Sequence, residues 1–322
     1  MRIVLEGTDI STTRLGFGCA GLMRLRSREA RTRLLETAFD EGIRHFDVAR
    51  MYGLGAAEGE LGAFLRGRRD RVVVATKFGI SPGRAGGGLR RLQGMVRPLL
   101  KRIPPLRAMA RARAEKLYEP RRYDAATARA SLETSLRELG TDYVDLLLLH
   151  EPTLEGIRVA ELLEFLDAAK RSGKIRAFGV AGGVEPTQEI RSRAPELTPV
   201  IQVPDDAIRR ARLPAARGRS EARITFGPFA AALTTIQQHL LADEERRRRW
   251  STRVDYDVGT SDSLARLLLG YALRANSAGV VLFSTTRPER VESAALWASE
   301  AASISDAVLD TFLDLIAREI EA

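Results

Sequence analysis

Strand-like runs of apolar and β-branched residues recur eight times along the 322-residue chain, with helical patterns between them. One helical pattern places Leu132, Leu136 and Leu139 on a single face before Gly140, a residue type that commonly ends helices. Eight alternating strand and helix units predict an α/β fold, a closed, parallel, eight-stranded (β/α)8 barrel of the TIM type. The predicted strands are Leu15 to Cys19, Arg44 to Asp47, Val72 to Lys77, Val144 to His150, Ile175 to Val180, Val200 to Val203, Ile224 to Phe226 and Val280 to Phe283.

A doubly wound parallel sheet is the alternative fold, but the chain lacks the nucleotide-binding fingerprint of that fold. No Gly-x-Gly-x-x-Gly opens a strand-to-helix turn with an acidic residue about twenty positions later. No long linker rich in proline, glycine or serine divides the chain, so we expect a single domain over residues 1–322. Helical spacing near the end predicts a C-terminal helix over residues 305–320, with Ser305 as its N-cap.

The net charge of +9 is concentrated in one segment, which follows the third predicted strand. Residues 80–123 contain twelve Arg or Lys and two acidic residues, a net charge of +10, whereas the rest of the chain carries −1. Because the charge is local, we expect no nucleic-acid partner. In a barrel, this basic insertion would rise from the C-terminal end, where it could act as a lid over a site.

Within the basic insertion, Leu92, Val96 and Leu99 recur at helical spacing with basic residues between them, and Pro98 interrupts the pattern. The pattern predicts a broken, basic amphipathic helix. Three interpretations remain open: a surface hairpin packed on the barrel rim, a lid that binds an anionic substrate or a cofactor phosphate, and an interfacial membrane contact. A dimer contact would also suit its exposed apolar residues.

A single cysteine, Cys19, and three histidines limit the chemistry open to the chain. One cysteine excludes an internal disulfide framework, and no Cys/His cluster has metal-ligand spacing, so we expect no metal. The first six residues are too short and too soon charged for a signal sequence, and no apolar run approaches the length needed to span a bilayer. These features predict a soluble, cytoplasmic protein.

Four chemically capable residues, Asp47, Tyr52, Lys77 and His150, end or closely follow predicted strands. Barrel enzymes place their chemistry at the C-terminal ends of the strands. A lone lysine or histidine at a strand end is more often a solvated end residue, but four such residues in order favour one proton-transfer site. We therefore expect a carbonyl reductase.

The motifs around these residues resemble those of the aldo-keto reductase family, and the resemblance extends from about Leu15 to about Ala294. It implies that the four residues form that family's catalytic tetrad. The motifs are His45-Phe46-Asp47, Met51-Tyr52-Gly53, Ala75-Thr76-Lys77-Phe78-Gly79, and Leu139-Gly140-Thr141-Asp142-Tyr143-Val144-Asp145 leading to His150.

The resemblance also implies a role for each tetrad residue. Tyr52 would be the general acid that protonates the oxygen of a carbonyl as it is reduced. The Lys77 ammonium would lower the pKa of Tyr52, and Asp47 would hold Lys77 in place. His150 would donate to, or orient, the same carbonyl oxygen.

Further family positions imply a nicotinamide cofactor, with NADP(H) preferred and NAD(H) also open. Gln202 matches the glutamine that hydrogen-bonds the nicotinamide carboxamide, and Phe226 the aromatic that stacks on the ring. Ser284, Thr285 and Arg290 follow the eighth strand and suit the adenosine phosphate, because hydroxyl and guanidinium groups bind dianions.

Besides the basic insertion, the chain departs from the family pattern in three places. Ala181-Gly182 stand where the family has Ser-Asn at the carboxamide, and Ser293-Ala294 stand where it has Glu-Asn near the adenine. Val48 replaces the threonine after the catalytic aspartate. The first two departures predict weaker cofactor binding.

The leading hypothesis is an NADPH-dependent oxidoreductase that reduces an aldehyde or ketone to an alcohol, with a small-molecule carbonyl, anionic or neutral, as its substrate. The first alternative is an NAD(P)-dependent dehydrogenase that oxidises a sugar or alcohol, since the same site works in reverse. The second is a barrel that binds nicotinamide nucleotide as a sensor with little turnover.

Overall fold

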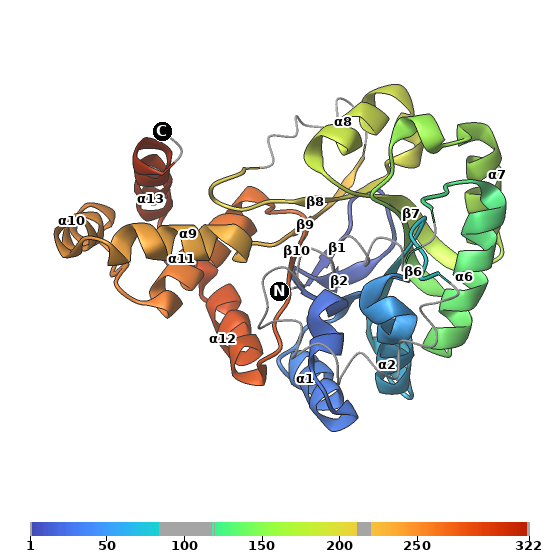
Figure 1. Cartoon of the computed structure of the whole chain (residues 1–322), viewed down its shortest axis with the longest axis horizontal. Coiled ribbons are helices and arrows are strands. Elements are labelled where there is room, and N and C mark those ends of the chain that lie inside the picture. Colours follow the sequence, from blue (N-terminus) through green and yellow to red (C-terminus); the bar gives the residue numbers. More distant parts are fainter. Residues whose placement is uncertain (1, 84–117, 119, 211–219, 321–322) are drawn as a thin grey trace, which may run out of the picture.

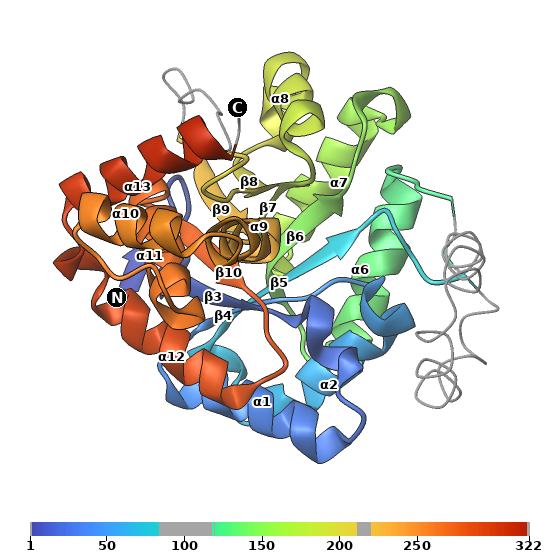
Figure 2. The same cartoon turned by 60° about the vertical axis from the view of Figure 1, so that its left-hand side comes forward.

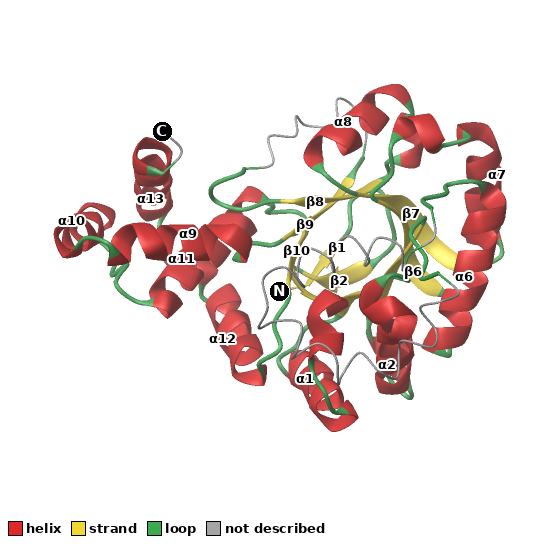
Figure 3. Ribbon diagram, in the orientation of Figure 1, coloured by secondary structure: helices red, strands yellow, loops and turns green. Residues whose placement is uncertain are grey.

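A closed barrel of eight parallel strands forms the centre of the computed structural model, which describes residues 2–83, 118, 120–210 and 220–320 (Figures 1 and 3). Each strand pairs with its neighbour in sequence, and the last strand closes the barrel against the first. The predicted fold is therefore confirmed, and every predicted strand overlaps an observed one. The barrel strands are β3 (Leu15–Gly18), β4 (His45–Asp47), β5 (Val73–Phe78), β6 (Val144–His150), β7 (Ile175–Ala181), β8 (Val200–Pro204), β9 (Ala222–Phe226) and β10 (Val280–Phe283).

Helices surround the barrel and cover its apolar outer face (Figure 2). Those that follow the strands are α1 (Arg28–Asp40), α2 (Ala56–Leu65), α6 (Ala125–Leu139), α7 (Val159–Arg171), α8 (Val184–Arg193), α11 (Ser261–Ala275) and α12 (Pro288–Ser299). Three more extend away from the strands on the left of Figure 1: α9 (Ala230–Leu241), α10 (Glu244–Val254) and α13 (Asp306–Glu319).

Local sequence signals account for several helix ends. Gly140 ends α6 in the left-handed conformation, with φ of 63°, as the sequence pattern predicts. At the start of the same helix, the Asp124 side chain accepts a hydrogen bond from the Thr127 amide at 2.7 Å. Helix α13 lies where the sequence predicts a C-terminal helix, and the Ser305 hydroxyl accepts from the Val308 amide at 3.3 Å.

A two-stranded hairpin that the sequence did not predict closes the N-terminal end of the barrel. Strands β1 (Arg2–Val4) and β2 (Ser11–Thr13) pair antiparallel, and the turn between them buries Leu5 and Ile10 beneath the barrel interior. These two residues share one apolar cluster with inward-facing strand residues such as Leu146. Further along the same strands, Lys77 and His150 follow Ala75 and Leu148 of this cluster by two positions. They therefore face inward as well, because side chains alternate between the two faces of a strand.

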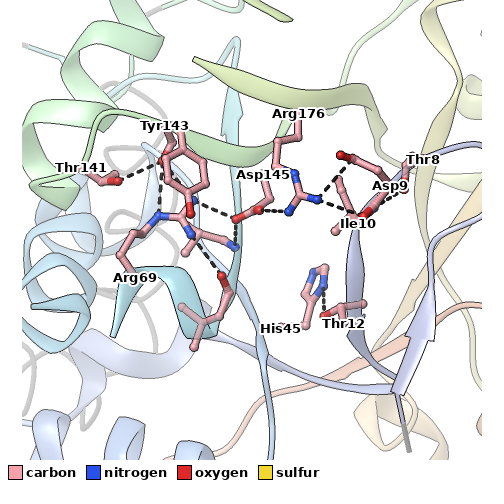
Figure 4. A network of polar contacts seen from close by, with 12 residues as sticks. Thr8, Asp9, Ile10, Thr12, His45, Arg69, Thr141, Tyr143, Asp145 and Arg176 are labelled. Carbon is pink, nitrogen blue, oxygen red and sulfur yellow. Dashed lines mark hydrogen bonds and ion pairs between the residues drawn. The ribbon is translucent and has the colours of Figure 1, made fainter. Parts of the chain in front are cut away.

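An ion network ties the hairpin to the barrel at this N-terminal end (Figure 4). Asp145 of β6 accepts from Arg69 and from Arg176, each at 2.8 Å, and from the Val74 amide at 2.9 Å. Arg176 also forms an ion pair with Asp9 of the hairpin turn at 3.3 Å. Asp145 is 1% exposed, so all of its charge is neutralised inside the network.

The basic insertion, residues 80–123, lies mostly outside the described residues, and so do its predicted helix, lid and membrane contact. The described parts of its two ends meet, because Pro82 and Tyr118 form an antiparallel bridge. In the described part of the chain, no helix is both long and apolar enough to cross a bilayer.

Candidate active site

A cavity of about 330 Å³ opens at the C-terminal ends of the barrel strands. The structure brings seven of the predicted site residues to its wall: Asp47, Tyr52, Lys77, His150, Gln202, Phe226 and Ser284. Two others, Thr285 and Arg290, are not part of this wall. Sites at this end of a barrel are typical of enzymes with this fold, because side chains from different strands converge there.

The deepest charged groups in the cavity are Asp47 and Lys77, which form a buried ion pair. They sit at inward positions on the neighbouring strands β4 and β5, where Asp47 aligns with Ala75. Lys77 Nζ donates to both carboxylate oxygens of Asp47, at 2.6 and 2.7 Å, and to the carbonyl oxygen of Val48 at 3.1 Å. Burial works against the charge, but Asp47 and Tyr52 outweigh it and raise the pKa of Lys77, which therefore stays an ammonium.

Tyr52 lies above this pair, with Lys77 Nζ 5.2 Å from the centre of its ring. The turn that carries it needs a left-handed backbone at Gly53, with φ of 60°, and at Leu54, with φ of 55°. A Cβ on Gly53 would lie 2.2 Å from Met23 Cγ, so only glycine fits there. The turn is thus packed tightly enough to fix the position of the tyrosine.

A second buried ion pair, which sequence reasoning missed, anchors the loop between Asp47 and Tyr52. Arg50 Nη1 donates to Glu58 Oε2 at 2.5 Å, and Thr76 Oγ1 donates to Glu58 Oε1 at 2.7 Å. Glu58 is fully buried on α2. The loop is therefore bonded to the helix that follows it and to the strand that carries Lys77.

The pKa of Tyr52 departs from the sequence-based prediction. Lys77 does lower this pKa, but burial has the larger effect and raises it overall. The expectation of a lowered pKa is therefore wrong in direction, because desolvation of the tyrosinate outweighs the nearby ammonium, whose charge Asp47 already neutralises. Tyr52 stays protonated at neutral pH, as a proton donor must.

His150 faces Tyr52 across the cavity, with its ring edge to face at 5.9 Å between ring centres. Burial, Lys77 and Arg121 lower the pKa of His150 to about 3, so its ring is neutral. Its Nδ1 is buried and has no partner among the described residues. A neutral imidazole carries one donor and one acceptor nitrogen, so it can orient a carbonyl oxygen without adding charge.

Tyr123 holds the backbone beside His150, a role for which the sequence carries no signal. Its hydroxyl donates to the carbonyl oxygens of His150 and Glu151, at 2.6 and 2.9 Å. Burial raises the pKa of Tyr123 to about 12, which keeps it a donor. Gly79 makes room for the ring: its φ is 107°, and a Cβ there would lie 2.1 Å from a ring carbon of Tyr123.

Glu151, also missed from the sequence, lines the same cavity. Its φ of 52° is uncommon for a residue other than glycine. The conformation is held from both sides, because the Glu151 amide donates to Ala181 at 2.7 Å and its carbonyl accepts from Tyr123. No ion pair of its side chain occurs within the described residues. Strained backbone of this kind concentrates at functional sites.

The far wall of the cavity can hold an amide and an aromatic ring. Gln202 of β8 donates from Nε2 to Asp47 Oδ2 at 3.1 Å, while its Oε1 is buried without a partner among the described residues. That oxygen is an unused acceptor for an amide N–H, and the half-buried Phe226 lines the same cavity. This arrangement fits the carboxamide and ring of a nicotinamide.

The predicted phosphate contacts follow β10 on the rim of the cavity. Ser284 is exposed and lines the cavity, whereas the exposed Arg290 lies in the first turn of α12. The Thr285 hydroxyl accepts from the Arg287 amide at 3.2 Å, which shapes the turn into that helix. A hydroxyl, a guanidinium and a helix start close in sequence suit an anion, although the structure does not bring the three residues into one wall.

Within the described part of the chain, no group of three or more His, Cys, Asp or Glu side chains could hold a metal ion. Cys19 is buried near Asp47 and Lys77, and burial raises the pKa of its thiol. A thiol that stays protonated is a poor nucleophile.

Comparison with known proteins agrees with this geometry. The chain is 27% identical to pyridoxal 4-dehydrogenase of Microbacterium luteolum over 91% of each sequence. It is 33% identical to D-threo-aldose 1-dehydrogenase of a Pseudomonas species over 53% of this chain, a match that spans half of that relative. Among solved structures, an aldo-keto reductase of Bacillus halodurans in its holo form superposes with a TM-score of 0.73 at 19% identity, over 96% of this chain and 95% of that one.

A glycerol dehydrogenase of Gluconobacter oxydans gives the same TM-score of 0.73 at 20% identity, over 100% of this chain and 96% of that one. At 19% and 20% identity, these two structures are evidence for the fold alone. The family model of the aldo/keto reductases matches residues 14–204, which span β3 to β8 and include the tetrad and Gln202. The chain therefore belongs to the aldo/keto reductase family, whose members are oxidoreductases that use nicotinamide cofactors.

Proposed function

We propose that this protein reduces a small aldehyde or ketone to an alcohol with NADPH as hydride donor, and that Tyr52 supplies the proton. The observation that carries the proposal is the buried Lys77 ammonium, bonded to both oxygens of Asp47 and lying 5.2 Å from the ring of Tyr52. A buried ion pair is costly, and its place directly beneath a protonated tyrosine in a cavity suits proton transfer.

Bound in this cavity, the nicotinamide would supply a hydride to the carbonyl carbon. Gln202 would accept a hydrogen bond from the carboxamide through its free Oε1, and Phe226 would pack on the ring. Tyr52 then delivers its proton to the carbonyl oxygen, on which negative charge develops. Lys77 stabilises the tyrosinate that remains, since its ammonium stays charged throughout, and neutral His150 orients the oxygen.

The charge in the cavity favours a neutral, hydroxyl-bearing carbonyl substrate over an anionic one. Lys77 is neutralised by Asp47, so Glu151 is the wall residue whose charge has no ion-pair partner among the described residues. The Arg121 guanidinium lies outside this wall, where it donates to the carbonyl oxygen of Glu151 at 3.1 Å. A carboxylate accepts hydrogen bonds from sugar hydroxyls and repels an anion. We therefore propose a neutral substrate rather than the anionic one that the basic insertion allows.

Oxidation of a sugar or alcohol is the second candidate, because the same residues catalyse either direction. The names of relatives favour it: D-threo-aldose 1-dehydrogenase, pyridoxal 4-dehydrogenase and glycerol dehydrogenase are all named as dehydrogenases. A protonated Tyr52 favours the reductive direction, since oxidation needs a base at that position.

Nucleotide fluorescence and turnover together test the proposal. NADPH and NADH are titrated separately into the purified protein, and then NADPH oxidation is followed with a panel of neutral, carboxylated and phosphorylated aldehydes. We expect tighter binding of NADPH, because Arg290, one of the predicted phosphate contacts, forms no ion pair with a described residue. We also expect the fastest turnover with the neutral hydroxyaldehydes. Binding without turnover of any aldehyde or alcohol would instead support a nucleotide-binding barrel with little activity.

A Glu151→Gln variant tests the substrate class separately, with Glu155→Gln as its matched control, because Glu155 is an exposed glutamate nearby that does not line the cavity. We expect Glu151→Gln to lower kcat/KM for glyceraldehyde and to raise it for glyceraldehyde 3-phosphate. An unchanged ratio of the two values would remove Glu151 from substrate selection and leave the reductase assignment intact.

A further inference from the structure

A second cavity, of about 420 Å³, lies at the opposite end of the barrel, between the hairpin and the N-terminal ends of β4 to β7. It plays no part in the proposed reaction. Four arginines contribute to its wall, against two acidic residues. The wall is formed by Arg2, Ser11, Arg44, Asp70, Arg71, Val72, Val73, Tyr143, Asp145 and Arg176.

The acidic residues of this wall leave it with a net positive charge. Asp145 is saturated by Arg69, Arg176 and a backbone amide, as Figure 4 shows, so it has no capacity for another cation. Asp70 lines the cavity but forms no ion pair within the described part of the chain. Arg2, Arg44 and Arg71 likewise have no ion pair with any described residue, and they are the charges that need an explanation.

Two of these arginines contact the same aromatic ring. The guanidinium carbons of Arg44 and Arg71 lie 3.9 and 4.7 Å from the centre of the buried Phe39 ring. Arg44 is fixed further, because its Nη1 donates to the carbonyl oxygens of Phe39 and Ile43, at 2.5 and 2.9 Å. Its Nε and Nη2 have no partner among the described residues and remain free for a ligand.

The like charges repel one another. Burial lowers the pKa of Arg44, and the charges of Arg71 and Arg2 lower it further, while the charge of Asp40 offsets part of this shift. An oxyanion in this cavity, which all three residues line, would reduce this repulsion and supply acceptors for guanidinium N–H groups, whose planar geometry suits an oxyanion. The Ser11 hydroxyl lines the same cavity as a further donor.

We propose that this cavity is a binding site for a phosphate group, held by Arg2, Arg44 and Arg71. A volume of about 420 Å³ exceeds that of a phosphate ion, so the site has room for the remainder of a phosphorylated metabolite. Free phosphate and a phosphomonoester share the chemistry that the arginines recognise, and the experiment below distinguishes them.

Isothermal titration at constant ionic strength tests the site, with inorganic phosphate in one arm and glucose 6-phosphate in the other. We expect saturable binding in at least one arm, and about tenfold weaker binding in Arg71→Gln, because a charge-assisted hydrogen bond is lost. Stronger binding of the ester than of the ion indicates a phosphorylated metabolite, and the reverse indicates free phosphate. Asp70→Asn should tighten binding several-fold, since it removes the remaining negative charge.

Two control variants locate the binding. Arg158→Gln changes an exposed arginine that pairs with Glu161, and it should leave the affinity unchanged. Arg290→Gln changes the predicted cofactor-phosphate contact at the other end of the barrel and should also leave it unchanged. Arg71 is exposed, so its variant should fold normally even if Arg44→Gln does not. No saturable binding, or binding that Arg290→Gln abolishes and Arg71→Gln leaves intact, would overturn the proposal.

Discussion

The two ends of the barrel carry their charges in opposite ways. At the C-terminal end, Lys77 and Asp47 are buried and satisfy each other, and the neighbouring His150 is neutral. At the N-terminal end, Arg2, Arg44 and the exposed Arg71 form no ion pair with any described acidic side chain, although Asp70 lines the same cavity. Burial explains the difference: an ammonium inside the barrel must be paired to persist, whereas solvent-facing arginines can stay free. The first arrangement suits chemistry on a neutral substrate, and the second suits binding of an anion.

Loss of the buried cation should have the largest effect. Lys77→Met leaves Asp47 buried without its partner, so we expect a loss of about 3 to 5 kcal/mol in the free energy of unfolding. We also expect kcat/KM to fall by about a thousandfold, because the tyrosinate loses its stabilising charge. Denaturant unfolding and NADPH-coupled turnover measure the two effects.

Lys174→Met is the matched control, since Lys174 pairs with Glu133 on the surface, where both side chains are over 40% exposed. An exposed pair is worth about 0 to 1 kcal/mol, so this variant should keep its stability and its activity. Equal losses in the two lysine variants would contradict the distinction between buried and exposed charge.

The loss of stability in acid can be compared at the two ends of the barrel, because His45 is buried at one end and His150 at the other. Burial lowers the pKa of His45, which bonds Thr12 of the hairpin, to about 4, and that of His150 to about 3. In the unfolded chain both titrate near 6.5, so unfolding takes up protons below that pH and stability falls as the pH drops from about 6.5 toward 4. Each histidine should contribute about 1.4 kcal/mol per pH unit across that window.

Unfolding free energies measured between pH 4.5 and 7.5 test this for each end separately. His45→Gln and His150→Gln should each remove one proton's share of the slope relative to the unchanged chain. Relative to the unchanged chain, both variants should therefore lose less stability at pH 5 than at pH 7. A slope that neither substitution alters would show that other groups control acid sensitivity.

A smaller effect is expected from Tyr123→Phe, which removes the donor shared by the His150 and Glu151 carbonyl oxygens. A lost buried hydrogen bond costs about 1 to 3 kcal/mol. Because the substitution releases the backbone that carries His150, kcat should fall by about tenfold with little change in NADPH binding. Tyr118→Phe is a control from the same insertion, since its hydroxyl makes no hydrogen bond with the described residues. A fall in stability without a fall in kcat would limit Tyr123 to a structural role.

The smallest effect on turnover should come from Arg71→Gln at the N-terminal end. The residue is exposed and far along the strands from the tetrad, so kcat and KM should change by less than about twofold. Steady-state kinetics in phosphate-free buffer measure this. A large fall in kcat would break the separation between the two ends and indicate that they are coupled.

Sequence reasoning succeeded wherever local periodicity decides the structure. All eight barrel strands and the end of α6 at Gly140 follow from runs of apolar residues and one glycine. The convergence of Asp47, Lys77 and His150 followed from the rule that strand ends meet at one end of a barrel.

The features that the sequence did not reveal depend on tertiary contacts. Tyr123 bonds a backbone segment 27 residues away, and no local pattern marks such a contact. The direction of the pKa shift at Tyr52 depends on how completely the folded chain excludes water, which outweighs the ammonium that the sequence places nearby. The arginine cavity joins residues from the hairpin to those of β7, and the hairpin itself was too short to predict.

Single-turnover oxidation of bound NADPH by a neutral hydroxyaldehyde, compared between the unchanged chain and Tyr52→Phe, tests the central claim most directly. Phenylalanine keeps the ring and removes only the proton donor. The account predicts that hydride transfer slows by about a hundredfold to ten-thousandfold while NADPH affinity stays the same. A rate within about twofold of the unchanged chain would contradict the assignment of Tyr52 as the acid.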